Sequence, residues 1–192
     1  MVSSGDEVVG TVEQLSVYPV KSLAGRAVEE VRVDETGLRG DRAWSVVEAG
    51  TGERVTVRTA PEMREVVATG DREADTITLT EVLGRPVRLE SAGAPQVDAA
   101  PVHLVSRQAI ARAEGGDVPE GCSAEDPRAN LLLSLPGADE RGWVGRRLRV
   151  GEVVLDVVRT PKHCLGVYAE VVTPGRVRAG DPVHLLAPGT SA

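Results

Sequence analysis

Apolar and polar residues alternate along the chain in short bursts, with the two-residue period that is typical of half-buried β-strands. Glycine, proline and aspartate separate these bursts. The pattern predicts a mostly β, barrel-like fold, with strands near residues 10–20, 28–34, 43–58, 76–90 and 146–172. Between two of the apolar runs, Gly151-Glu152 predicts a tight hairpin turn that has glycine in its first position.

One or two short helices are expected beside the strands. Thr59-Ala60-Pro61-Glu62 combines a cap residue, a proline in the first turn and a glutamate three residues after the cap, which predicts a capping box. Ser106 is expected to cap a second helix over residues 107–114, which Gly115-Gly116 would end. The small, polar stretch 90–101 is the best candidate for an internal boundary.

Composition strengthens the β prediction. Valine supplies 32 residues, against 16 leucines and 2 isoleucines, and phenylalanine is absent. Because valine is β-branched, it favours strands over helices. A length of 192 residues suits one domain, or two small subdomains that share a core.

Charge and hydropathy narrow the function. A net charge of −7 leaves no excess of basic residues for phosphates, so nucleic-acid binding is not expected. The sequence has no run of 18 apolar residues, and its start resembles no secretory signal, so no membrane segment is expected. Two cysteines, Cys122 and Cys164, are too few for a disulfide scaffold. We therefore expect a cytoplasmic protein with reduced thiols.

Arginine supplies 20 of the 22 basic residues, and the two lysines, Lys21 and Lys162, both fall in segments rich in reactive or charged groups, although chance explains this equally well. Four such segments stand out: Val17–Ser22, Gly37–Trp44, Asp126–Asn130 and Pro161–Cys164. Each alone has a structural explanation. An arginine beside an aspartate forms an ion pair, an arginine and an asparagine brace a loop, and a cysteine often packs as a small hydrophobe.

Together the segments suit one ligand. Five residues are hydrogen-bond donors for an anion that carries phosphate: Lys21, Ser22, Arg42, Arg128 and Asn130. Cys164 is a potential soft metal ligand, and the positive charge of Lys162, with His163 adjacent, would favour its thiolate. No spacing typical of zinc sites or of phosphate-binding loops is present. A phosphorylated pterin that carries a metal requires both kinds of group.

The order of several short motifs resembles a known family. The order YPVKS, GLRGDRAW and TVRTAPEM resembles the N-terminal β-barrel part of MOSC proteins, and the run GWVGRRLRVGEVVLDVVRTPKHCLGVYAEV followed by GDPV is similar to the MOSC core. The resemblance covers roughly residues 10 to 187. It implies an N-terminal barrel part over residues 8–95 and a core with the ligand cysteine over residues 96–188.

The resemblance also implies a cofactor and the residues that hold it. In this family, which includes amidoxime-reducing molybdenum enzymes and the C-terminal domain of molybdenum cofactor sulfurase, a cysteine ligates molybdenum. That catalytic role falls on Cys164. The expected contacts to the phosphate end and the pterin of the molybdenum cofactor are Lys21, Ser22, Arg42, Arg128 and Asn130. Ala129 stands where the family has proline, which leaves the substrate open.

Three functions are compatible with these residues. The first is reduction of small N-hydroxylated compounds at a Cys164-ligated molybdenum. Only Cys122 would remain for an iron–sulfur cluster, which needs four cysteines, so electrons would come from a separate flavin or iron–sulfur protein. The second is a carrier that holds sulfur on Cys164 or delivers the cofactor; pyridoxal phosphate is not expected in this chain. The third is a barrel without a ligand.

Two expectations follow for the site. The six residues should converge on one cleft although Lys21 and Cys164 are far apart in the chain. The two cysteines should also differ, because Cys122 lies in a loop rich in glycine and proline with no cation beside it. We expect no ligand role for Cys122 and a reactive thiol at Cys164.

Overall fold

The computed structural model describes residues 6–91, 93, 99–119, 127–137 and 139–187. The chain forms two compact units, each made of separate stretches. The first, here called the barrel unit, comprises Met1–Ser16, Val28–Arg39 and Ala99–Ala192; the second, the small unit, comprises Val17–Ala27 and Gly40–Asp98. The two compact units alternate along the chain. The family boundary expected between residues 95 and 96 stays a prediction.

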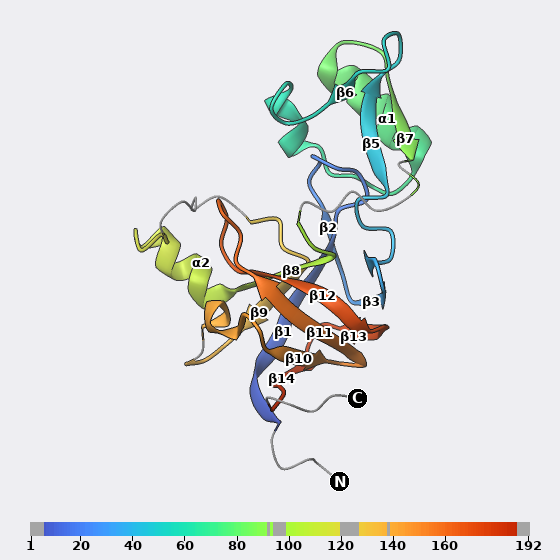
Figure 1. Cartoon of the computed structure of the whole chain (residues 1–192). Helices are drawn as coiled ribbons and strands as arrows, with labels where there is room; N and C mark the ends of the chain where they lie inside the picture. The colour runs from blue at the N-terminus through green and yellow to red at the C-terminus, as the bar shows by residue number, and fades with distance from the viewer. Residues whose placement is uncertain (1–5, 92, 94–98, 120–126, 138, 188–192) are drawn as a thin grey trace. The chain divides into compact units, whose positions relative to one another are not determined.

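Seven strands form a closed barrel in the barrel unit (Figure 1). They are β1 (Glu7–Val17), β8 (Val102–Ser106), β9 (Leu131–Ser134), β10 (Arg147–Val150), β11 (Val153–Arg159), β12 (Val167–Thr173) and β14 (Pro182–Leu185). The order is β14-β10-β11-β12-β8-β9-β1-β2, where β2 is Arg26–Val28, and β1 pairs back to β14. Only β8 and β9 among the barrel neighbours run parallel. A separate sheet contains β13 (Gly175–Arg178), β3 (Glu30–Asp34) and β4 (Gly37–Leu38).

The barrel follows directly from the alternating pattern. In β11 the side chains of Val153, Leu155 and Val157 are buried, while the residues between them are partly exposed. Successive side chains of a strand point to opposite faces, so this alternation places one apolar row inside the barrel. The predicted mostly β, barrel-like fold is confirmed, but the strands predicted near residues 28–34 and 43–58 lie in the two separate three-stranded sheets and not in the barrel.

The turn between β10 and β11 also follows from the sequence. Gly151 has a φ of +57°, as a glycine-first hairpin turn requires. A Cβ on this residue would lie 2.7 Å from the carbonyl oxygen of Arg176. The predicted turn is therefore confirmed, and glycine is needed there for space as well as for conformation.

The small unit packs one helix on a three-stranded sheet of order β6-β5-β7 (Figure 1). Its elements are β5 (Trp44–Glu48), β6 (Arg54–Val55), the 3₁₀ helix η1 (Pro61–Glu65), α1 (Arg72–Leu83) and β7 (Val87–Ser91). Val46, Leu79 and Leu89 are among the buried residues of its core.

The strand predicted near residues 76–90 is wrong over its first half, because residues 72–83 form α1. The Asp71 side chain caps this helix by accepting from two backbone N–H groups, and Gly84 ends it with a φ of +62°. Ile77 is 54% exposed and Leu79 is fully buried, so this pair lies on different faces of the helix. Two apolar residues two positions apart resembled a strand, whereas only one of them faces the core.

The proline-led helix η1 begins where the sequence predicts, but its cap is different. The N-cap is Ala60, and no side chain caps the first turn. Thr59 instead donates its hydroxyl to the carbonyl of Thr56 at 3.1 Å. The predicted capping box is therefore wrong, since the threonine stabilises the preceding turn.

The helix α2 (Arg107–Glu114) confirms the predicted cap and adds a partner from far along the chain. Ser106 accepts a hydrogen bond from the N–H of Ala109 at 2.9 Å. The N–H of Ser106 donates to Oε1 of Glu140 at 3.1 Å, and Glu140, in the 3₁₀ helix η2 (Glu140–Trp143), is fully buried. A capping box normally takes this acid from the helix itself. Here the tertiary structure supplies it.

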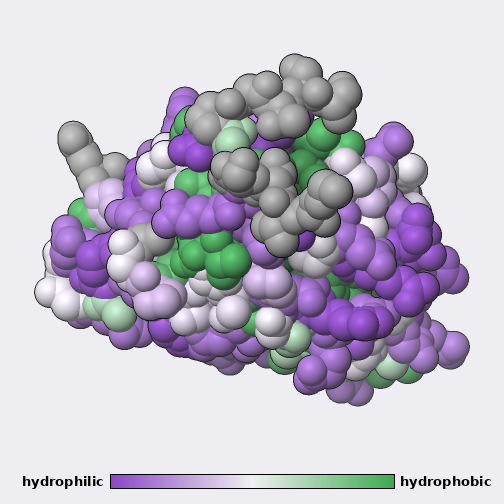
Figure 2. Space-filling model, turned by 90° about the horizontal axis from the view of Figure 1, so that it is seen from below, coloured by the Kyte–Doolittle hydropathy of each residue, from purple (hydrophilic) through white to green (hydrophobic). Residues whose placement is uncertain are grey.

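No helix within the described ranges has the length and apolar character needed to cross a bilayer. On the face drawn in Figure 2, hydrophilic side chains surround smaller hydrophobic areas. The most exposed large hydrophobic residues that the structure describes are Val8, Val67 and Ile77.

Candidate functional site

The six predicted residues are divided equally between the two units. Lys21, Ser22 and Arg42 belong to the small unit, and Arg128, Asn130 and Cys164 belong to the barrel unit. Each group has a defined geometry within its own unit. Convergence of all six on one cleft stays a prediction.

In the small unit, the Tyr-Pro-Val-Lys-Ser segment lies beside the segment that contains Arg42. The N–H of Arg42 donates to the carbonyl of Tyr18 at 2.6 Å, and the N–H of Lys21 donates to the carbonyl of Trp44 at 2.8 Å. Val20 and Trp44 form a parallel bridge between the two segments. Two motifs that are separated in the sequence are thus adjacent, and the buried Ser22 follows directly after the pairing.

The side chain of Arg42 is held by two residues that the sequence did not identify as part of the site. Asp41 and Arg42 are both buried and form an ion pair. The second carboxylate oxygen of Asp41 accepts the N–H of Tyr18 at 2.8 Å. The guanidinium carbon of Arg42 lies 5.1 Å from the centre of the Tyr18 ring, within the range of a cation–π contact. Asp41 and Tyr18 therefore fix where the Arg42 charge lies.

Replacing Asp41 by asparagine is expected to destabilise the small unit by about 3 kcal/mol, because the buried charge of Arg42 would lose the carboxylate of its ion pair with Asp41. Urea unfolding measures this loss. The matched control is Asp34→Asn, which breaks exposed pairs with Arg32 and Arg39 and should change stability far less. Equal losses in the two variants would contradict the assigned role of Asp41.

In the barrel unit, Cys164 lies beside the Arg128 segment. Cys164 occupies the loop between β11 and β12, is partly exposed, and donates its thiol to the carbonyl of Pro127 at 3.6 Å. Lys162 and His163, which precede it, are exposed. The potential soft ligand and the arginine expected to contact the pterin are therefore neighbours in space.

A small apolar cluster supports both segments. It contains residues from β8, from α2 and from the two segments: Val105, Ala109, Ala113, Ala129 and Leu165. Ala129 lies between two predicted site residues, and Leu165 directly follows Cys164. Because both are buried in one cluster, the packing under α2 fixes the two segments relative to each other.

The amide of Asn130 joins two strands of the barrel. Asn130 is 1% exposed; its Oδ1 accepts from the N–H of His103 at 3.1 Å and its Nδ2 donates to the carbonyl of Ser16 at 3.3 Å. This gives the side chain a structural role beside the Arg128 segment, and its predicted pterin contact stays a prediction.

His103, which lies in β8 and is 4% exposed, is not among the site residues predicted from the sequence. Its Nε2–H donates to the carbonyl of Leu165 at 2.8 Å. No spacing marks this histidine, because it lies within an apolar strand far from either segment in the sequence.

Backbone strain coincides with the predicted site. Three non-glycine residues in the described ranges have a positive φ: Ser22 at +74°, Arg42 at +48° and Arg128 at +49°. This conformation costs a side-chain-bearing residue about 1 kcal/mol or more. All three are residues that the sequence predicts to bind the cofactor, and such strain is concentrated at functional sites.

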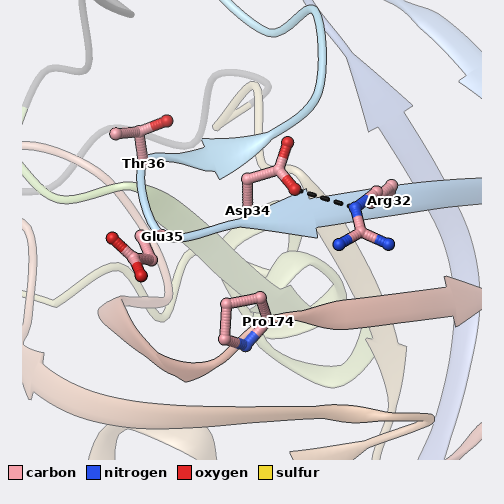
Figure 3. A pocket seen from close by; sticks show the side chains of 5 residues that line it. All are labelled: Arg32, Asp34, Glu35, Thr36 and Pro174. Carbon is pink, nitrogen blue, oxygen red and sulfur yellow. Dashed lines mark hydrogen bonds and ion pairs between the residues drawn. The ribbon is translucent and has the colours of Figure 1, made fainter.

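A pocket of about 370 Å³ lies elsewhere in the barrel unit, lined by Arg32, Asp34, Glu35, Thr36 and Pro174 (Figure 3). Arg32 donates to Asp34 at 2.9 Å. This bond, with a further bond from Arg39, holds the pKa of the Asp34 carboxyl below its usual range. None of the six predicted residues lines this pocket.

Comparison with known proteins identifies the family. The sequence model of the MOSC N-terminal beta barrel domain matches residues 9–124. Human mitochondrial amidoxime-reducing component 1 is 42% identical over 76 residues, and molybdenum cofactor sulfurase of Solanum lycopersicum is 43% identical over 49 residues. These matches cover 38% and 26% of this chain, but only 22% and 6% of the relatives' own lengths.

The fold agrees with a solved structure of low sequence identity. The YUAD protein from Bacillus subtilis superposes with a TM-score of 0.53 over 96% of this chain and 98% of its own, at 16% identity. This likeness concerns the fold alone. The family match extends over more than half of the sequence and includes most of β1 and all of β8, so the chain belongs to the MOSC N-terminal beta barrel domain family.

Proposed function

We propose that the chain binds the molybdenum cofactor and reduces small N-hydroxylated compounds, with the Cys164 thiolate as the ligand of the metal. The observation that carries the proposal is the contact of the Cys164 thiol with the carbonyl of Pro127, the residue before Arg128. It brings a soft ligand next to the backbone of the segment that carries Arg128, and a metal on an anionic pterin requires both a soft ligand and a cation.

The three predicted residues of the small unit have side chains that suit the phosphate end of the cofactor. Lys21 and Arg42 supply positive charge, and Ser22 supplies a hydroxyl. The pairing of their two segments and the clamp on Arg42 by Asp41 support this role, because a preorganised donor loses little freedom when an anion binds. The strained backbone at Ser22 and Arg42 supports it as well.

The protein and the cofactor divide the work between them. When bound, the cofactor supplies the two-electron redox chemistry that cleavage of an N–O bond needs. Cys164 would hold the metal through sulfur, because a thiolate is a soft ligand. The same proposal has a separate flavin or iron–sulfur protein supply the electrons, and it places the protein in the cytoplasm.

A second candidate is carriage of sulfur or of the cofactor without turnover. It is favoured by the partial exposure of Cys164, because a thiol that carries sulfur must be reached by another protein. The match to a molybdenum cofactor sulfurase is compatible with it.

Metal analysis tests both candidates. The chain is produced in a host that makes the cofactor, and molybdenum and pterin are measured per protein, followed by reduction of a simple N-hydroxylated compound with an artificial electron donor. Molybdenum near one equivalent together with turnover is expected. Molybdenum without turnover would favour carriage, and protein without molybdenum or pterin would overturn the proposal.

A further inference from the structure

We infer that His103 is a positioning residue for Cys164: its ring N–H holds the carbonyl of Leu165, the residue after the cysteine, and so sets the direction of the thiol. The inference concerns the geometry of the thiol, and it matters for catalysis only if the proposed function is right. It rests on the hydrogen bond of His103 to Leu165 and on the packing of the loop around it.

The ring of His103 has a fixed orientation. His103 pairs with Tyr168 across β8 and β12, and the two rings have centres 4.7 Å apart with planes tilted by 45°. Nε2 lies 2.8 Å from the carbonyl oxygen of Leu165. A carbonyl only accepts, so Nε2 carries the proton in this bond.

The same residue is tied to the Arg128 segment. The backbone N–H of His103 donates to Oδ1 of Asn130, and the carbonyl of His103 accepts the N–H of Asn130 at 2.8 Å. One buried residue therefore contacts both segments that carry predicted site residues in the barrel unit.

The chain after Cys164 is held at three points. The carbonyl of Leu165 is bound by His103, and the Leu165 side chain is buried in the cluster under α2. Gly166 approaches β8 so closely that a Cβ would lie 2.1 Å from the carbonyl oxygen of Leu104. The side chain of Cys164 is partly exposed, whereas the backbone after it is not free to turn. The hydrogen bond from His103 is the one polar contribution among these three.

A buried histidine also has a plain structural explanation, because any satisfied polar group stabilises a core to some extent. The two roles differ in what they change. A structural histidine changes stability alone, whereas a positioning histidine changes the reactivity of Cys164 at unchanged stability or beyond what lost stability explains.

The experiment uses the full chain with Cys122→Ser, so that Cys164 is the sole thiol. Rates of Cys164 alkylation by iodoacetamide are measured on the metal-free protein over a pH range of about 6 to 9, where thiolates form, together with the melting temperature. His103→Phe keeps a ring against Tyr168 but removes the donor. His103→Gln places an amide N–H near the position of Nε2. Val183→Ala is the control, since Val183 is buried in β14, separated from β8 by β9 and β1.

For His103→Phe the alkylation rate should change by about threefold to tenfold, the range that one lost hydrogen bond corresponds to. His103→Gln should restore the parent rate and pH profile. Val183→Ala should lower the melting temperature and leave the rate as in the parent. An unchanged rate in His103→Phe, or a rate that follows the melting temperature in all variants, would overturn the inference.

Molybdenum content of the same proteins separates this inference from the proposed function. A parent chain without molybdenum whose alkylation still responds to His103→Phe would remove the proposed function and keep the positioning role. A parent that takes up molybdenum, together with a His103→Phe variant that takes up as much molybdenum and is alkylated at the parent rate in its metal-free form, would remove the positioning role and keep the proposed function.

Discussion

Replacing Cys164 by serine is expected to abolish molybdenum-dependent reduction and to lower the molybdenum content strongly, while the fold is retained. Serine has nearly the shape of cysteine but offers a hard, weakly acidic oxygen in place of a soft thiolate. The site is partly exposed, so the exchange leaves no large cavity. Metal analysis, reduction of an N-hydroxylated compound with an artificial donor, and circular dichroism measure the three consequences. Pterin should be retained in part, because its proposed contacts are on other residues.

The matched control is Cys122→Ser. Cys122 lies outside the described residues, and the sequence places no cation beside it, so metal content and activity should stay at the parent level. Bound metal should also protect Cys164 from alkylation while Cys122 still reacts. If Cys122→Ser loses both metal and activity and Cys164→Ser loses neither, the assignment of the ligand is wrong.

Replacing Gly166 by alanine is expected to destabilise the barrel unit by about 4 kcal/mol, through overpacking and an unfavourable φ together. Gly166 has a φ of +84°, and a Cβ there would lie 2.1 Å from the carbonyl oxygen of Leu104 and 3.1 Å from Cα of Val105. Both neighbours are backbone atoms of a buried strand, so the loop that carries Cys164 has to move instead. Urea unfolding and the molybdenum content of the same protein measure the two effects.

Gly180→Ala isolates the contribution of the close contact. Gly180 has nearly the same φ, +89°, but no atom lies within 4 Å of a Cβ at this position. This variant should lose only the conformational part, about 1 to 2 kcal/mol, and should keep its molybdenum. Equal losses of unfolding free energy in Gly166→Ala and Gly180→Ala would show that the close contact with β8 adds nothing to the cost of a side chain at residue 166.

Local patterns in the sequence predicted four of the seven barrel strands, β1, β10, β11 and β12, whereas β8, β9 and β14 lie outside the predicted ranges. The alternation in β11, the glycine-first turn at Gly151 and the serine cap of α2 each depend on neighbours within a few residues, and all three are confirmed. The family was also determined by order and spacing of short motifs. The residue types suited to an anionic ligand and a soft metal could be named for the same reason, since their chemistry belongs to the side chain itself.

The helix α1 shows where local pattern was insufficient. Ile77 and Leu79 are two residues apart, and a strand would have placed both on one face. The segment forms a helix because Asp71 caps its first turn and because Leu79, but not Ile77, is buried in the core of the small unit. The choice between the two-residue period of a strand and the period of about 3.6 residues of a helix depended on packing, which a short apolar pair does not specify.

Only the tertiary structure decided how the candidate site is held. Glu140 completes the cap of α2 from 34 residues away, and Asp41 holds the neighbouring guanidinium while it accepts the backbone N–H of Tyr18. His103 binds the carbonyl of Leu165 across 62 residues. Each of these contacts joins a buried polar side chain to a backbone group of a distant segment. The sequence specifies the chemistry of each side chain, but the partner of a buried polar group depends on which strands are neighbours in the folded chain.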